Sequence, residues 1–198
     1  MTRQALRYEV ATSSRPCTGE VVNGDLACWR VIGDSVFVLM LDATGHGSEA
    51  RAVAETAERV FGASPLDDPG VFLALLDQTL RGTRGAAAAL VRLDLVERRL
   101  TYAGVGNTSG RLLGQADVQF VSRDGILGQR FRAPKTRSMD LWPNDLLVLH
   151  SDGISGRFSL ETFVDLRESE VRKVADHLLD RYGKMHDDAA CAVVRVKA

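Results

Sequence analysis

The sequence predicts an α+β fold in which two packed β-sheets are covered on their outer faces by helices. Apolar runs of strand length follow one another through short turns, and three longer segments repeat apolar residues at helical spacing. Consecutive hairpins favour mainly antiparallel sheets, and each amphipathic helix needs a sheet face to cover. Because no linker, repeat or low-complexity tract divides the chain, residues 1–198 are expected to form a single domain.

The N-terminal third is expected to be built from strands. Residues 8–12 form a short first strand that ends in a turn around residues 13–16, and residues 20–31 form two extended pieces broken at Asn23-Gly24. Asn-Gly favours a hairpin turn, so Asp25 directly after it needs no role beyond turn punctuation. The unbroken apolar run over residues 36–41 is typical of a buried strand and is the centre of the predicted fold.

Helices and further strands follow the central run. Helical spacing predicts a helix over residues 50–61, a second with Asp68 as N-cap and Pro69 as first residue, and a third capped by Ser169 and ended by Gly183. The remaining strands are expected at residues 91–95, 100–102, 111–113, 118–121, 139–142, 146–150 and 191–196.

Composition excludes several classes of protein. The net charge is -1 and the pI is about 6.4, so no global field favours nucleic acid or an anionic membrane surface. No apolar run approaches the ~18 residues of a membrane span, and the N-terminus lacks the apolar core of a signal peptide. Cys17, Cys28 and Cys191 are odd in number and widely spaced, which argues against a disulfide framework. We therefore expect a cytoplasmic protein with reduced cysteines.

Three aspartates, Asp42, Asp152 and Asp187, carry the main functional prediction. Each adjoins the end of an apolar strand, and the first two precede turns that contain glycine. Any one alone is best interpreted as a solvated residue at a strand end. If the strands lie side by side, however, the three carboxylates meet, and a divalent cation is the usual way to keep such charges ionised together. Two Mg²⁺ or Mn²⁺ ions at this point would lower the pKa of a bridging water and hold a phosphoryl oxygen.

Other chemistries fit the residues less well. His46 lies near Asp42 and is a candidate general acid or base, but it is equally a loop histidine. No His or Cys pair has zinc-site spacing. No cysteine has an arginine six residues later, which excludes a thiol phosphatase loop, and residues 81–85, RGTRG, lack the Lys-Ser/Thr of a P-loop. The basic run from Arg130 to Arg137 is typical of a solvated face, although an acidic protein partner remains an alternative.

With these residues identified, the chain resembles the metal-dependent serine/threonine phosphatases of the PPM superfamily, in their SpoIIE-like branch. Its ordered segments are similar to the GD, DGxGxG, (S/T)DG and DD-x-T motifs of the family: Asn23-Gly24-Asp25, residues 42–47 (DATGHG), Ser151-Asp152-Gly153 and residues 187–190 (DDAA). The ordered set spans almost the whole chain. Size and the segment over residues 84–107 are most similar to the small stressosome phosphatases of this branch.

The resemblance implies an αββα sandwich and a specific set of metal ligands. Asp42 would bridge two Mn²⁺ or Mg²⁺ ions, the Ala43 carbonyl would bind one of them, Asp152 and Asp187 would complete the pair, and Asp25 would lie in or near the site. Water would attack phosphorus in line, without a phosphoenzyme. The implied substrates are phosphoserine or phosphothreonine on STAS-domain stressosome proteins (RsbS- and RsbR-like), and dephosphorylation would reset stress signalling. We expect a monomer.

Two departures from the family pattern and two alternative functions follow from the comparison of motifs. Ala43 replaces a glycine, which a ligand that uses its backbone carbonyl tolerates, and Ala190 replaces a threonine, which removes a minor hydrogen bond near Asp187. One alternative is a SpoIIE-like phosphatase of an anti-sigma factor antagonist. The other is a catalytically inactive adaptor that binds STAS proteins; the three retained aspartates argue against it, because a binding module gains nothing from their mutual repulsion.

Overall fold

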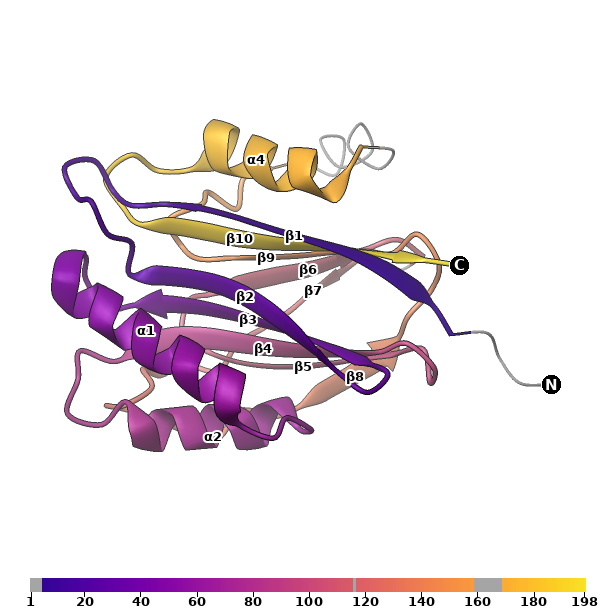
Figure 1. The fold of residues 1–198 in the computed structure, drawn as a ribbon, viewed down its shortest axis with the longest axis horizontal. Helices are drawn as coiled ribbons and strands as arrows, with labels where there is room; N and C mark the ends of the chain where they lie inside the picture. Colours follow the sequence, from indigo (N-terminus) through magenta and orange to yellow (C-terminus); the bar gives the residue numbers. More distant parts are fainter. Residues whose placement is uncertain (1–4, 116, 159–168) are drawn as a thin grey trace.

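The computed structural model describes residues 5–115, 117–158 and 169–198, which form two packed antiparallel sheets (Figure 1). The spatial order in the first sheet is β1 (Arg7–Arg15), β10 (Ala189–Lys197), β9 (Leu146–His150), β6 (Ser109–Leu113) and β7 (Val118–Gln119). The order in the second sheet is β2 (Asp25–Ile32), β3 (Ser35–Ala43), β4 (Ala86–Asp94), β5 (Arg99–Val105) and β8 (Arg137–Asp140).

Helices cover both outer faces of this sandwich. The helices α1 (Gly47–Ala63) and α2 (Pro69–Thr79) lie on the second sheet, and α4 (Val171–Tyr182) lies on the first (Figure 1). The layer order is therefore helix, sheet, sheet, helix, and the predicted α+β class and αββα arrangement are confirmed. In the part of the chain that the structure describes, no helix is long and apolar enough to cross a membrane.

The strand β3 shows why the central run contains no polar residue. Phe37, Leu39 and Leu41 point toward α1 and α2, whereas the alternate residues Val36, Val38 and Met40 point into the layer between the sheets. A strand buried on both faces cannot show the apolar–polar alternation of a half-exposed strand. Each large side chain buried in this way contributes roughly 1.5–3 kcal/mol to folding.

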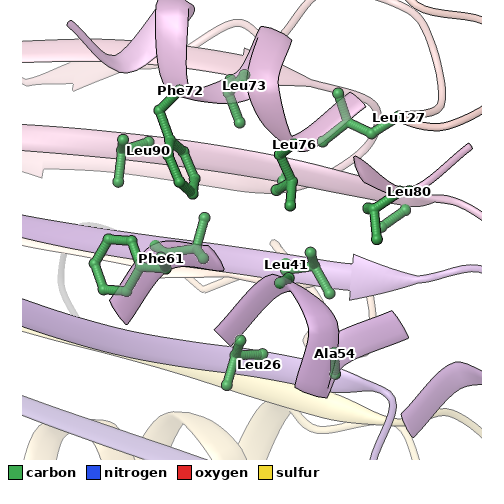
Figure 2. Packing of buried hydrophobic residues seen from close by; sticks show 14 of the residues in the cluster. Leu26, Leu41, Ala54, Phe61, Phe72, Leu73, Leu76, Leu80, Leu90 and Leu127 are labelled. Atoms are coloured by element: carbon green, nitrogen blue, oxygen red, sulfur yellow. The ribbon is translucent and has the colours of Figure 1, made fainter. Parts of the chain in front are cut away.

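Aromatic and aliphatic side chains attach α1 and α2 to the second sheet. Phe61 of α1 and Phe72 of α2 meet edge to face with ring centroids 5.9 Å apart, and both lie over the sheet beside Leu41 and Leu90 (Figure 2). The predicted cap of α2 is confirmed, because an Asp68 carboxylate oxygen accepts hydrogen bonds from the backbone N–H groups of Gly70 and Val71. These contacts fix α1 and α2 on the sheet. The start of α1 is thereby held close to the end of β3, which precedes it in the chain.

The N-terminal strands differ from the prediction. β1 continues to Arg15, which pairs with Ala189, so no turn interrupts it at residues 13–16. Residues 20–24 do not form a strand, because the Gly24 N–H donates to the buried Asp188 carboxylate instead of to a neighbouring strand. Only the second of the two extended pieces predicted there is present, as β2.

Smaller differences occur later in the chain. Ser169 does not cap α4: Glu170 occupies the N-cap position, and its side chain makes no capping hydrogen bond. β8 covers Arg137–Asp140 and so begins and ends two residues earlier than the predicted strand at residues 139–142. The strand predicted at residues 118–121 is present only over its first two residues.

Candidate metal centre

The site is assembled at one end of the sandwich, where β2 and β10 begin and β3 and β9 end. In the antiparallel register of β2 and β3, Asp25 lies directly opposite Asp42. Asp25 is only 5% exposed, and its backbone N–H donates to the Asn23 side-chain oxygen at 2.8 Å, which fixes the turn before β2. The interpretation of Asp25 as turn punctuation alone is therefore wrong, because a surface turn residue would not be buried against a second carboxylate.

The first sheet contributes two more carboxylates to the same place. The Asp152 N–H points toward an Asp42 carboxylate oxygen across the gap between the sheets, at 3.5 Å. Asp42, Ala43, Asp152 and Asp187 all line one cleft with a volume of about 920 Å³, and the buried Asp25 is the strand partner of Asp42. Antiparallel strands from two sheets thus bring together every residue that the sequence nominated for the metal.

Burial and mutual repulsion raise the pKa values of these carboxyl groups. Desolvation, followed by the charge of Asp42, raises the pKa of Asp25 to about 8. Desolvation, followed by the charge of Asp152, raises the pKa of Asp42 to about 7 and also raises the pKa of Asp187. In the metal-free protein, part of this charge is therefore neutralised by protons, which a divalent cation would displace.

The residues present fit a hard divalent cation. One carboxylate oxygen of Asp25, Oδ2, is buried without a hydrogen-bond partner, and no ion pair between described residues involves Asp25, Asp42, Asp152 or Asp187. Carboxylate and carbonyl oxygens are the ligands that Mg²⁺ and Mn²⁺ prefer. Within the described ranges, no three acidic, histidine or cysteine side chains are yet gathered at ion-binding distance. Such spacing is expected of like charges without a cation between them.

Asp188 has a different role from its neighbour Asp187. Its carboxylate is 2% exposed and accepts hydrogen bonds from the N–H groups of Cys17 and Gly24, each at 2.8 Å. It therefore holds the segment before β2 against the start of β10. The sequence shows two adjacent aspartates. Neighbouring side chains at the end of a strand point to opposite sides, so one of the two points to the cleft and the other into the protein.

The cleft is lined by further residues besides the predicted metal ligands, and of these only His46 was considered as a catalytic group from the sequence. The Asn107 side-chain N–H donates to an Asp152 carboxylate oxygen at 2.5 Å. Asp124 and Arg130 come from the segment after β7 and also line the cleft. His46 also lines the cleft, and its Nδ1 lies 2.8 Å from a Glu20 carboxylate oxygen. Asn107 follows Gly104 and Gly106 at the end of β5. This glycine-containing strand end is the sequence signal that could have indicated it.

Comparison with known proteins agrees with this geometry. The family model of Stage II sporulation protein E (SpoIIE) matches residues 32–197, which is most of the chain. The chain belongs to the SpoIIE family. It is a PPM-type serine/threonine phosphatase, as the ordered motifs indicated.

Individual relatives of this SpoIIE-family chain are distant in sequence and close in fold. Phosphoserine phosphatase RsbX of Bacillus subtilis is 21% identical over 139 residues, which cover 69% of this chain and 70% of RsbX. RsbX in complex with magnesium superposes with a TM-score of 0.83 at 17% identity and covers 97% of this chain and all of RsbX.

Two further solved structures share the fold. One comes from work on the bacterial stressosome as a modular system adapted to control secondary messenger signalling; it has a TM-score of 0.90 and 28% identity, and covers 96% of this chain and all of its own. The catalytic domain of the phosphatase PstP, solved with two manganese ions, has a TM-score of 0.69 and 18% identity, and covers 98% of this chain and all of that domain.

Proposed function

We propose that this SpoIIE-family protein is a phosphoserine and phosphothreonine hydrolase that depends on Mn²⁺ or Mg²⁺, with two ions held at the cleft. The ligands are the carboxylates of Asp42, Asp152 and Asp187 and the carbonyl of Ala43, with the buried Asp25 paired to Asp42. The observation that carries the proposal is the convergence of these carboxylates from two sheets, none of which forms an ion pair with another described side chain. Without a ligand to bind, the fold gains nothing from their repulsion.

Each side chain at the cleft has a definite part in this reaction. When bound, the ions activate a water for attack on phosphorus and neutralise the phosphoryl oxygens. Asp42 faces both Asp25 and Asp152, so it would hold metal together with either neighbour. Asn107 orients Asp152 through its 2.5 Å hydrogen bond. Arg130, which also lines the cleft, offers a positive charge to the phosphate that enters.

The substrates that we propose are phosphorylated STAS-domain proteins of a stressosome, of the RsbS and RsbR type. Two findings support this choice: the relative RsbX is named a phosphoserine phosphatase, and the chain with a TM-score of 0.90 was solved in work on the stressosome. Dephosphorylation would return the stressosome to its state before stress. The proposal includes action as a single-domain monomer in the cytoplasm.

Phosphate release from phosphorylated RsbS-like and RsbR-like proteins tests the proposal. The assay compares Mn²⁺, Mg²⁺ and chelator, for the wild type and for Asp42→Asn, which keeps the size of the side chain and removes its charge. We expect metal-dependent release by the wild type and a loss of at least ~10³-fold in the variant. Tight binding of the phosphoproteins without release under any metal condition would overturn the proposal in favour of a binding adaptor.

A further inference from the structure

A second pocket, of about 210 Å³, opens beside β5 and is lined by three cationic side chains. We call it the basic pocket; it consists of Gly104, Val121, Ser122, Arg123, Pro134, Lys135 and Arg137. It lies at the free edge of the second sheet, where β8 stops pairing with β5 and residues 121–123 take its place beside Val105. The carboxylates of the metal site line the neighbouring cleft and are absent from this pocket's lining.

The backbone of two of these cations is fixed by β5. The Arg123 N–H donates to the Gly104 carbonyl at 2.9 Å, and the Arg123 carbonyl accepts from Gly106 at 2.8 Å. Arg137 pairs with Tyr102 at the first position of β8. The backbone between them is tightly packed, because a Cβ at Gly104 would lie 2.2 Å from the Tyr102 hydroxyl and 2.5 Å from the Ser122 hydroxyl. The pocket is therefore part of the fold rather than a gap between loosely held loops.

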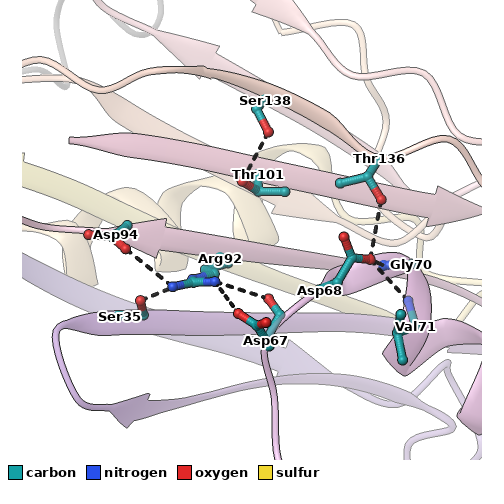
Figure 3. A network of polar contacts seen from close by, with 10 residues as sticks. All are labelled: Ser35, Asp67, Asp68, Gly70, Val71, Arg92, Asp94, Thr101, Thr136 and Ser138. Carbon is teal, nitrogen blue, oxygen red and sulfur yellow. Dashed lines mark hydrogen bonds and ion pairs between the residues drawn. The ribbon is translucent and has the colours of Figure 1, made fainter. Parts of the chain in front are cut away.

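The third cation, Lys135, is held through its neighbours. The Thr136 hydroxyl donates to the Asp68 carboxylate at 3.3 Å, and Asp68 is the residue that caps α2. On the other side, Ser138 and Thr101 join β8 to β5 through a hydroxyl pair at 3.2 Å (Figure 3). These contacts anchor the chain around Lys135 while its own side chain stays exposed.

The charges of the pocket are not neutralised within the described part of the chain. No ion pair between described residues involves Arg123, Lys135 or Arg137. The Arg123 guanidinium donates only to a carbonyl oxygen, that of Ala133, at 3.2 Å. Residues 121–137 contain five Arg or Lys side chains and a single acidic residue, in a chain whose net charge is -1. Exposed cations held close together without partners repel one another and favour an anionic ligand.

We propose that the basic pocket binds an acidic segment of the phosphoprotein substrate, a few residues away from the phosphorylated side chain. The proposal rests on the function proposed above and extends it to substrate selection. Arg123 lines the pocket and the next residue, Asp124, lines the metal cleft, so one extended peptide can reach both. The exposed Val121 and the ring of Pro134 offer apolar contact to such a peptide.

Nucleic acid fits the pocket less well than an acidic peptide does. Nucleic-acid sites combine cations with aromatic rings on which bases stack, and no aromatic side chain lines this pocket. The overall charge of -1 also provides no long-range attraction for a polyanion. Recognition by three local cations matches a short run of carboxylates better than a continuous phosphate backbone.

The test compares two phosphoserine peptides that differ only in their flanks, one with glutamates and one with glutamines at the same positions. It uses the wild type and the triple variant Arg123→Gln, Lys135→Gln and Arg137→Gln. A matched control replaces Arg59, Lys173 and Arg181 with glutamine; these exposed residues line neither pocket, and the same charge is removed. We expect the ratio of kcat/KM for the acidic peptide to that for the neutral peptide to fall at least 10-fold in the pocket variant and less than 2-fold in the control.

A direct binding measurement separates this proposal from the proposed function. Hexaglutamate is titrated into each protein, with chemical shifts of the 121–137 backbone as readout, so no catalysis is required. Saturable shifts in the wild type and the control, lost in the pocket variant, support the pocket even if no phosphate is released from any substrate. The proposal would be overturned if the kcat/KM ratio were the same for all three proteins, or if the pocket variant showed the same chemical-shift changes as the wild type. It would also be overturned if a single-stranded oligonucleotide of the same charge bound more tightly than hexaglutamate.

Discussion

The buried Asp188 carboxylate and the Gly24 backbone N–H are joined by a 2.8 Å hydrogen bond that connects the two sheets behind the metal cleft. Asp188 precedes β10 of the first sheet, and Gly24 precedes β2 of the second. Each partner is the direct neighbour of a proposed ligand, because Asp187 comes before Asp188 and Asp25 comes after Gly24. The spacing of ligands from different sheets thus depends on one carboxylate that does not itself line the cleft.

The first prediction contrasts two adjacent aspartates. Asp188→Ala leaves two buried N–H groups without acceptors, so we expect the free energy of unfolding to fall by roughly 2–4 kcal/mol. Asp187→Ala removes a partly exposed carboxylate whose pKa is raised by desolvation and by the charge of Asp152, so stability without metal should not fall, while activity is lost. Urea unfolding and phosphate release measure the two effects. Equal destabilisation by the two variants would contradict these roles.

The second prediction concerns pH and metal. The pKa values of Asp25 and Asp42 are raised to about 8 and about 7 in the folded protein, above the ordinary value of 3.8. Between about pH 4 and about pH 8, the folded state therefore binds more protons than the unfolded state. By linkage, the stability of the metal-free protein falls as the pH rises through this range. Because Mn²⁺ replaces the protons, saturating metal should abolish this fall.

Thermal unfolding with chelator and with Mn²⁺, at pH 5 and at pH 8, measures the effect. In Asp42→Asn one of the two titrations is absent, so we expect its metal-free Tm at pH 8 to exceed that of the wild type by roughly 2–4 °C, which corresponds to about 1 kcal/mol. The same variant should gain little from Mn²⁺. A metal-free wild type whose Tm does not change with pH would show that the carboxylates do not repel one another.

The third prediction concerns Asn107, which donates to Asp152 and contacts the cleft. Asn107→Ala leaves Asp152 free to rotate, and loss of such an orienting hydrogen bond typically costs 10–100-fold in metal affinity or activity. We expect kcat to fall by that factor and the Mn²⁺ concentration for half-maximal activity to rise. Asn107→Asp should be worse, because it adds a further negative charge to the site. Wild-type metal dependence in the alanine variant would exclude this role.

The fourth prediction uses two glycines three residues apart. A Cβ at Gly153 would lie 1.8 Å from the Asp188 carbonyl oxygen, which is backbone and cannot move aside, whereas a Cβ at Gly156 meets nothing within 4 Å. Gly153→Ala should therefore destabilise the protein by about 3 kcal/mol or more and displace Asp152 from the cleft. Gly156→Ala should change the stability by less than about 0.5 kcal/mol. Thermal unfolding of the two variants, followed by circular dichroism, measures this difference in stability.

The sequence predicted most of the fold because its local signals agree with the tertiary structure. The apolar run of β3, the helical spacing of α1 and α2, and the Asp68 cap are determined by a few neighbouring residues each. Ser169 failed as a cap because serine favours that position only when the following N–H groups are oriented toward it, and α4 begins two residues later. Such an offset of one residue, from Ser169 to Glu170 at the N-cap, is decided by how the helix packs on the sheet.

The site was predicted in part for a related reason. Asp42, Asp152 and Asp187 are visible in the sequence because each breaks an apolar strand at its end. The pairing of Asp25 with Asp42 depends on the β2–β3 register. The Asn-Gly turn did not indicate this register, because it was interpreted as a hairpin turn within residues 20–31. The basic pocket was harder to predict, because Arg123 and Arg137 are brought together by pairing with neighbouring positions of β5 and not by their spacing along the chain.

The pairing of β1 with β10 also determines how the protein responds to a pulling force. Arg7 lies opposite Lys197, so both ends of the described sandwich leave it on the same side, far from the cleft. Tension between the two ends would therefore separate the strands one residue pair at a time, like a zipper, from Arg7–Lys197 toward Arg15–Ala189. Asp187 and Asp188 follow only after the last pair. An unfoldase that pulls on β1 from its Arg7 end would thus remove the outer strand of the first sheet before it reaches the metal site.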